Sequence, residues 1–243
     1  MNIIVYFLIL FSFSSLAKDD DVIQGRVQLS TDTLTVDFPL DSEWESKLIT
    51  NDGEMPAFVL SSVLELKNPG ETEELLEEVS YQNAPVIIPD KIVIPAKSSK
   101  RVKFVLPKTY KKDKDRVFRI SFSPVTPKVE DGFELSKLDL EQYTTSGLTL
   151  NVGIGFLVIV PRSDPQPDLK VAINQDGQLS FDNIGNTLIH IKEMEICRED
   201  GDCKVFPLSK RLVSGAKWFF DDDLIDLNNS IKIKTKELDT MSI

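Results

Sequence analysis

The stretch that decides the fold is residues 147–161, GLTLNVGIGFLVIVP. Its first half carries aliphatic side chains at alternate positions, namely Leu148, Leu150, Val152 and Ile154. Its second half, residues 156–160, is apolar without interruption. A period of two is typical of a β-strand with two different faces, whereas a continuous apolar run is typical of a buried strand. We therefore interpret residues 148–160 as one strand, in which a buried stem holds an apolar row that is offered to another protein.

Short apolar segments with Pro and Gly between them precede this strand. We expect strands at residues 27–38, 45–50, 57–66, 86–89, 91–95, 99–106 and 116–123. Their spacing of about ten residues is the pattern of a β-sandwich. The acidic residues 71–78 are interpreted as a solvated loop, and the polar residues 127–146 as a mobile loop that leads into the strand of the first paragraph.

A proline-rich segment separates this half of the chain from a second one. Residues 161–167, PRSDPQP, contain three prolines, which favour a stiff and extended linker. Beyond it we expect strands at residues 169–173, 178–181, 188–197, 204–208, 217–220 and 231–236. The chain of 243 residues is long enough for two domains. The sequence thus predicts an all-β protein with domains at residues 18–161 and 162–243.

The first 17 residues, MNIIVYFLILFSFSSLA, predict a secretory signal peptide that is cleaved after about Ala17. Their apolar run is shorter than the roughly 20 residues that a membrane-spanning helix needs, and no other segment is long enough. Export places the mature chain in an oxidising compartment. Because Cys197 and Cys203 are the only cysteines, we expect one disulfide between them, at the tip of a hairpin.

Charge and composition exclude several classes of function. The net charge of −11 argues against nucleic-acid binding, because phosphate contacts need clustered Lys and Arg. His190 is the only histidine, which leaves little material for imidazole catalysis or for a metal site. It lies in the expected strand 188–197, and no Ser or Cys nucleophile motif accompanies it. We therefore expect that the protein is not an enzyme. If His190→Ala caused no loss of activity, the alternative of an enzyme would be left without support.

Two blocks in the first half, IVIPAKSSKRVKF at residues 92–104 and DRVFRI at residues 115–120, resemble the periplasmic pilus chaperones, which are PapD-like. The similarity is greatest to the alternate branch, of the CS1 type and common-pilus type. NIGN at residues 183–186 and the paired cysteines support it in the second half. The resemblance implies two immunoglobulin-like β-sandwich domains in an L-shaped arrangement. It also implies a periplasmic chaperone that binds fimbrial subunits and delivers them to an outer-membrane usher.

Donor-strand complementation, in which the chaperone lends a strand to an incomplete subunit, is the mechanism that the resemblance implies. The subunit-binding row would be Leu148, Leu150, Val152 and Ile154. A basic residue would hold the terminal carboxylate of the subunit in the cleft between the domains. Arg119 is our first choice for this anchor, with Lys103 and Arg26 as further candidates, and Arg162 would tie the two domains together.

The sequence departs from the pattern of the better-known branch at one position. That branch has an anchoring lysine late in the donor strand, where this chain has residues 153–156, GIGF. The resemblance implies no cofactor, metal, small-molecule substrate or membrane insertion. A noncatalytic alternative is a secreted immunoglobulin-like adhesin or a pilus-associated structural module, in which the row at residues 148–154 would be buried in its own domain.

Overall fold

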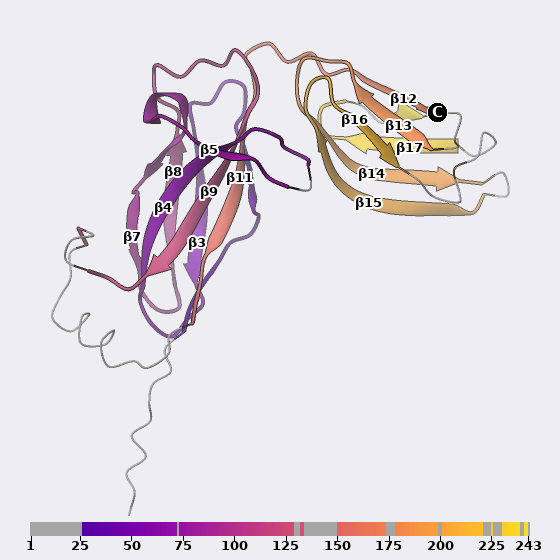
Figure 1. Ribbon diagram of the computed structural model, residues 1–243. Coiled ribbons are helices and arrows are strands. Elements are labelled where there is room, and N and C mark those ends of the chain that lie inside the picture. The colour runs from indigo at the N-terminus through magenta and orange to yellow at the C-terminus, as the bar shows by residue number, and fades with distance from the viewer. Residues whose placement is uncertain are drawn as a thin grey trace, which may run out of the picture.

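The structure is a computed structural model that describes residues 26–71, 73–128, 132–133, 150–173, 178–198, 201–220, 225, 230–238 and 241–242. The expected signal peptide, Leu148 and most of residues 127–146 lie outside this set. The described chain forms two β-sandwiches that meet at an angle (Figure 1), which confirms the all-β fold. In this part of the chain, no helix has the length and apolar character needed to cross a membrane.

The first sandwich consists of two sheets with the strand orders β10-β1-β3-β8-β6 and β2-β11-β9-β4-β5, and β7 pairs with β4. Its strands are β1 (Arg26–Ser30), β2 (Thr35–Asp37), β3 (Trp44–Asn51), β4 (Ala57–Leu66), β5 (Leu76–Glu78), β6 (Val86–Ile88), β7 (Lys91–Ile94), β8 (Ser98–Val105), β9 (Arg116–Val125), β10 (Leu150–Val152) and β11 (Ile154–Val160). A short 3₁₀ helix, η1 (Tyr81–Asn83), precedes β6. The end of the acidic stretch, expected to be a loop, is the exposed edge strand β5.

The core of this sandwich lies between its two sheets. Phe104, Phe122 and Phe156 are fully buried, and their rings meet edge to face with centroids 5.7–6.4 Å apart. Such ring pairs add to the stabilisation that burial of their apolar surface provides. Val158 and Val160 continue the buried side of β11. The prediction of a buried stem at residues 156–160 is confirmed, with Leu157 only half-buried.

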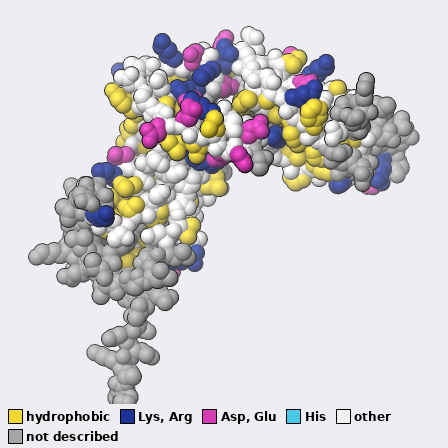
Figure 2. All heavy atoms as spheres, in the orientation of Figure 1, with side chains coloured by type: hydrophobic (Ala, Val, Ile, Leu, Met, Phe, Trp, Pro, Cys, Tyr) yellow, Lys and Arg dark blue, Asp and Glu magenta, His cyan; other side chains and the backbone are white. Residues whose placement is uncertain are grey.

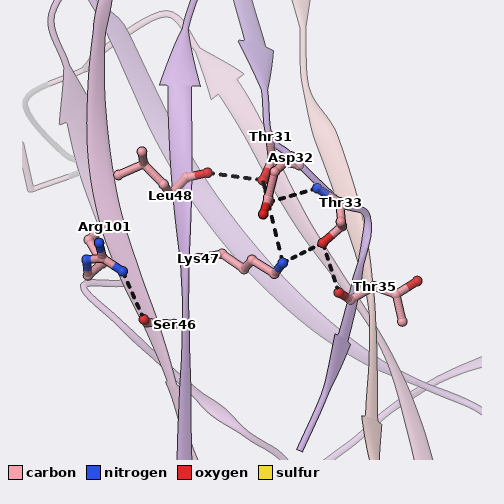
Figure 3. A network of polar contacts seen from close by, with 8 residues as sticks. All are labelled: Thr31, Asp32, Thr33, Thr35, Ser46, Lys47, Leu48 and Arg101. Carbon is pink, nitrogen blue, oxygen red and sulfur yellow. Dashed lines mark hydrogen bonds and ion pairs between the residues drawn. The ribbon is translucent and has the colours of Figure 1, made fainter.

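The chain changes sheets between β1 and β2, where the sequence predicts one continuous strand. A polar network holds this crossing in place (Figure 3). The Thr31 hydroxyl donates to the carbonyl of Leu48 at 3.0 Å, and the Asp32 carboxylate accepts from the Thr33 N–H at 2.8 Å. Lys47 forms an ion pair with the same carboxylate at 3.4 Å. Two of these bonds satisfy backbone groups at the crossing, the Leu48 carbonyl and the Thr33 N–H. The chain then continues as β2, which pairs with β11 in the other sheet.

The second sandwich has a sheet of order β12-β13-β16 and a sheet of order β15-β14-β17-β18. Its strands are β12 (Leu169–Ile173), β13 (Leu179–Asn183), β14 (Ile189–Cys197), β15 (Cys203–Leu212), β16 (Lys217–Phe220), β17 (Ser230–Thr235) and β18 (Met241–Ser242). Leu179, Phe181 and Ile191 are among its fully buried side chains. The strand β15 runs four residues beyond the expected end at residue 208, toward the first sandwich.

Candidate functional site

The apolar row lies on a strand that crosses between the two sheets of the first sandwich. β10 pairs in parallel with β1, and β11 pairs antiparallel with β9 and in parallel with β2. Gly153 stands at the crossing, where a Cβ would lie 2.6 Å from the carbonyl oxygen of Phe122. No side chain fits so close to a backbone oxygen. The glycine at this position therefore follows from packing, and a basic anchor cannot occupy it.

The residues of the row have different surroundings. Val152 is 39% exposed on β10, which is the last strand of its sheet in the described chain. Ile154 is half-buried and packs against the core of the first sandwich. Leu150 lies in β10, opposite Arg26 of β1, and Leu148 is outside the described residues. The sheet crossing thus divides the row, with Ile154 turned toward its own domain and Val152 toward solvent.

Arg119 lies on β9, opposite Leu157 of β11 and Leu64 of β4. Its guanidinium forms an ion pair with Glu74 through two bonds, one from Nη2 to Oε1 and one of 3.3 Å from Nε to Oε2. Arg119 and Glu74 line a cleft of about 400 Å³ between the two sandwiches. The wall of this cleft also carries apolar side chains, among them Leu34, which is 57% exposed.

A second arginine, Arg211 of β15, enters the same cleft from the other sandwich. Its Nη2 donates to the Thr35 hydroxyl at 3.3 Å, while its Nε is buried without a hydrogen-bond partner among the described residues. Burial lowers the pKa of Arg211, and the positive charge of Arg119 lowers it further, although Asp37 and Glu237 act in the opposite direction. The cleft therefore brings two guanidinium groups from different domains together, an arrangement that suits an anion.

The other basic candidates lie elsewhere. Lys103 is on β8, between β3 and β6, and its Nζ lies 5.2 Å from the centroid of the Trp44 ring. Arg26 lies opposite Leu150, whereas Arg119 lies opposite Leu157. These two strand positions are seven residues apart, which is about 23 Å along an extended strand. The structure does not bring either residue to Arg119.

One carboxylate connects the two sandwiches and the linker. Asp115 precedes β9, and its Oδ1 accepts a bond of 2.7 Å from the backbone N–H of Arg162 in the linker. Its Oδ2 accepts from the Thr187 hydroxyl at 2.7 Å and from the backbone N–H of Leu188, both in the second sandwich. The Arg162 guanidinium donates to Asp164 at 2.9 Å and to the Asn186 carbonyl at 3.4 Å.

Apolar and backbone contacts complete this joint. Leu66, Val117 and Ile159 of the first sandwich form a cluster with Leu188 and Val213 of the second. The turn after β4 rests on β15, because Lys210 Nζ donates to the Gly70 carbonyl at 2.6 Å and a Cβ on Gly70 would lie 2.1 Å from the Arg211 carbonyl oxygen. Figure 2 shows apolar side chains on the concave side where the sandwiches meet, with acidic side chains next to them.

His190 lies on β14 at a cavity of about 310 Å³ between the sandwiches. Its Nε2 is 3.3 Å from the Ser209 Oγ, a pair that sequence reasoning missed because the two residues meet only through strand pairing. Burial lowers the pKa of His190 to about 4, and the nearby Arg211 lowers it as well. An imidazole with so low a pKa is a poor base for activating a hydroxyl group near neutral pH.

The predicted disulfide between Cys197 and Cys203 is confirmed. It joins the ends of β14 and β15, which are opposite each other in the sheet. Glu195 lies close to the two sulfur atoms, but thiols that are oxidised to a disulfide do not supply thiolate ligands to a metal.

The fold relates this chain to solved structures of fimbrial proteins. No family model matches the sequence. Over 143 residues the chain is 27% identical to a CFA/I fimbrial protein of Escherichia coli, and the match spans 56% of each protein, little more than half of that relative. The structure of the class 5 fimbriae chaperone CfaA matches with a TM-score of 0.61 at 17% identity, covering 89% of this chain and 98% of that one.

The same fold occurs in a chain from the complex of the Salmonella enterica SafA pilin with the SafB chaperone. Its TM-score is 0.53 at 12% identity, and the match covers 89% of this chain and 95% of that one. The fold is that of a two-domain fimbrial chaperone. Each of the two matches covers 89% of this chain, so both sandwiches take part in it.

Sequence reasoning selects Arg119 as a candidate, but it does not select three other residues of the joint and the cleft. Arg211 has no motif around it, and the block at residues 115–120 does not by itself give Asp115 a role, because the contacts of both residues depend on how one sandwich packs on the other. Glu74 lies in the acidic run that the sequence predicts to be a solvated loop. The sequence NPG at residues 68–70 is typical of a turn, but nothing in it indicates that the turn rests on β15.

Proposed function

We propose that this chain is a periplasmic chaperone that binds and stabilises fimbrial subunits and delivers them to an outer-membrane usher by donor-strand complementation. The observation that carries the proposal is the strand that crosses from β11 to the sheet edge at β10, with Val152 exposed, in a two-sandwich fold shared with fimbrial chaperones. An exposed edge strand is a template for pairing with another chain, which is also what an incomplete sandwich requires.

The division of the row at Gly153 assigns different roles to its residues. Leu148, Leu150 and Val152 are the side chains that enter the open core of the subunit, while Ile154 anchors the strand in the chaperone. Burial of one Val or Leu side chain contributes about 1.5–3 kcal/mol before the cost of ordering is subtracted. Main-chain hydrogen bonds along β10 supply the remaining affinity.

Arg119 anchors the terminal carboxylate of the subunit, and Arg211 is its partner in the cleft. This pair replaces Lys103 and Arg26, which lie away from Arg119. Two arginines suit the task because a guanidinium grips a carboxylate through two parallel hydrogen bonds. The exposed Leu34 in the same cleft offers an apolar contact to the side chain next to that carboxylate.

Binding supplies the free energy in this mechanism, so the proposed chaperone is not an enzyme and needs no ATP, cofactor or metal. Residues 1–17 direct export, and the periplasm provides the oxidising conditions under which the disulfide forms. The partners are the fimbrial subunits and the usher.

Co-expression with candidate fimbrial subunits from the same locus tests the proposal. A soluble one-to-one complex is expected, and it should be weakened by Val152→Asp and by Arg119→Ala. Val205→Asp is the matched control for the first variant, because Val205 is 50% exposed on an edge strand of the other sandwich. Arg101→Ala controls for the second variant. Arg101 donates to the Ser46 hydroxyl (Figure 3), and both residues lie in the sheet that does not contain Arg119.

Two results would overturn this assignment. If no subunit forms a soluble complex, the function is wrong, and the noncatalytic adhesin or structural module becomes the better account. If a complex forms but the site variants and their controls behave alike, the chaperone function stands and the proposed residues do not.

A further inference from the structure

The arginine that we assign to the subunit carboxylate is already paired with a carboxylate of this chain. Glu74 contacts the Arg119 guanidinium through both of its oxygens, on the Nε and Nη2 edge. That edge is one of those through which an arginine grips a carboxylate with two parallel bonds. Neither side chain is deeply buried, since 30% of Arg119 and 37% of Glu74 remain exposed. The pair therefore occupies the binding geometry at a place that an incoming group can reach.

One side chain bonds to the loop on both sides of Glu74. Asn68 Nδ2 donates to the Glu73 carbonyl at 2.7 Å, and Asn68 Oδ1 accepts from the Leu75 N–H at 2.6 Å. The two bonds bracket residue 74 on both sides, so that its side chain is presented to Arg119. The turn that contains Asn68 rests in turn on β15 through Gly70. The carboxylate is thus built into the joint between the domains.

The charges of the cleft favour one anion beside the two arginines. Arg119 and Arg211 repel each other, and within the part of the chain that the structure describes the buried Nε of Arg211 has no hydrogen-bond partner. Glu74 offsets the charge of Arg119 but has no bond to Arg211 in the described structure. A second carboxylate in the cleft would reduce the repulsion between the two guanidinium groups, which favours an external anion there.

We propose that Glu74 is a placeholder carboxylate. In the free protein it holds Arg119 in the binding rotamer, and the terminal carboxylate of a bound fimbrial protein displaces it. This inference rests on the proposed chaperone function and describes how its anchoring site is regulated. In the exchange one ion pair replaces another, so the guanidinium always has a carboxylate partner. Because Glu74 occupies this position in the free protein, weaker anions are kept out of the cleft.

The test is a competition between two chaperone variants for one subunit. A denatured fimbrial subunit that forms the complex with the wild type is refolded in an excess of an equimolar mixture of wild type and Glu74→Gln, each with a different affinity tag. Because Gln no longer competes for the guanidinium, the variant should capture about 1.5 to 5 times more subunit than the wild type. Glu73→Gln is the matched control, since it removes the same charge from the same loop while the backbone contact of Glu73 with Asn68 remains.

Two further arms locate the effect. In an Arg119→Ala background the advantage of Glu74→Gln should vanish, because there is no guanidinium left to free. With a subunit extended at its C-terminus by a short Gly-Ser tail, which moves the carboxylate out of the cleft, the advantage should vanish as well. Equal capture by Glu74→Gln and Glu73→Gln, or an advantage that survives in the Arg119→Ala background, would overturn the placeholder role. Absence of any complex with the wild type would instead overturn the proposed function itself.

Discussion

Asp115 gives the sharpest test of how the two sandwiches are joined. Its two oxygens accept three bonds, from the Arg162 N–H, the Thr187 hydroxyl and the Leu188 N–H. Asp115→Asn keeps the shape of the side chain but turns one acceptor into an NH₂ group. Whichever way the amide is oriented, at least one of the donors then faces another donor.

The expected cost follows from these bonds. A hydrogen bond to a charged group contributes about 1.5–3 kcal/mol, and a neutral bond roughly 1 kcal/mol. In the variant one of the three bonds to the carboxylate is lost, and the other two become bonds to the oxygen of a neutral amide. Since the carboxylate is partly exposed, solvent compensates for some of this loss, and we expect the free energy of unfolding to fall by about 2–3 kcal/mol.

Calorimetry and small-angle scattering measure this effect. For a protein of this size the expected loss corresponds to a decrease in Tm of about 4–12 °C, and the scattering profile should show a wider range of angles between the sandwiches. The control is Asp113→Asn, an exposed residue two positions earlier. If both variants have the same Tm and the same scattering profile, the joint does not depend on the Asp115 carboxylate and our reasoning is wrong.

Three further outcomes are expected. Gly70→Val should lower the Tm and loosen the joint, because Gly70 has a φ of 96° and its Cβ would clash with the Arg211 carbonyl; an unchanged Tm would contradict this. The pKa of His190 is near 4 in the folded protein and about 6.5 when unfolded, so stability should fall as the pH drops from 6.5 to 4, and His190→Gln should reduce that fall by about 1–2 kcal/mol in urea titrations. Replacing Cys197 and Cys203 by Ser should cost roughly 2 kcal/mol of unfolding free energy, also measured in urea.

Local patterns are enough to predict most of the strands and the buried stem. Alternation and turn residues act between near neighbours, so that the strands expected at residues 57–66 and 169–173 have the bounds that the structure shows. The disulfide follows from the number of cysteines and the expected compartment. The two-domain chaperone arrangement comes from resemblance, because periodicity alone does not say how two sandwiches meet.

What the sequence could not predict depends on contacts between distant parts of the chain. The strand at residues 148–160 reads as continuous, yet it changes sheets at Gly153, where the Phe122 carbonyl lies so close to the backbone that no side chain fits. In the sequence, Glu74 is one acidic residue among several. Only the folded structure shows that it pairs with Arg119. Arg211 joins the same cleft only because the turn at Gly70 packs on β15.

The sheet crossing also limits how the proposed strand donation and carboxylate anchoring can work together. Arg119 lies opposite Leu157, and the exposed Val152 is five positions earlier, about 17 Å along the strand. A subunit strand with its terminal carboxylate at Arg119 therefore has to extend by about five residues before it reaches Val152. Since side chains alternate between the two faces of a strand, a shift by one residue would turn the wrong face of the subunit toward the row. In the proposed mechanism, the anchor therefore sets the register, and Gly153 marks the boundary of the donated part of the strand.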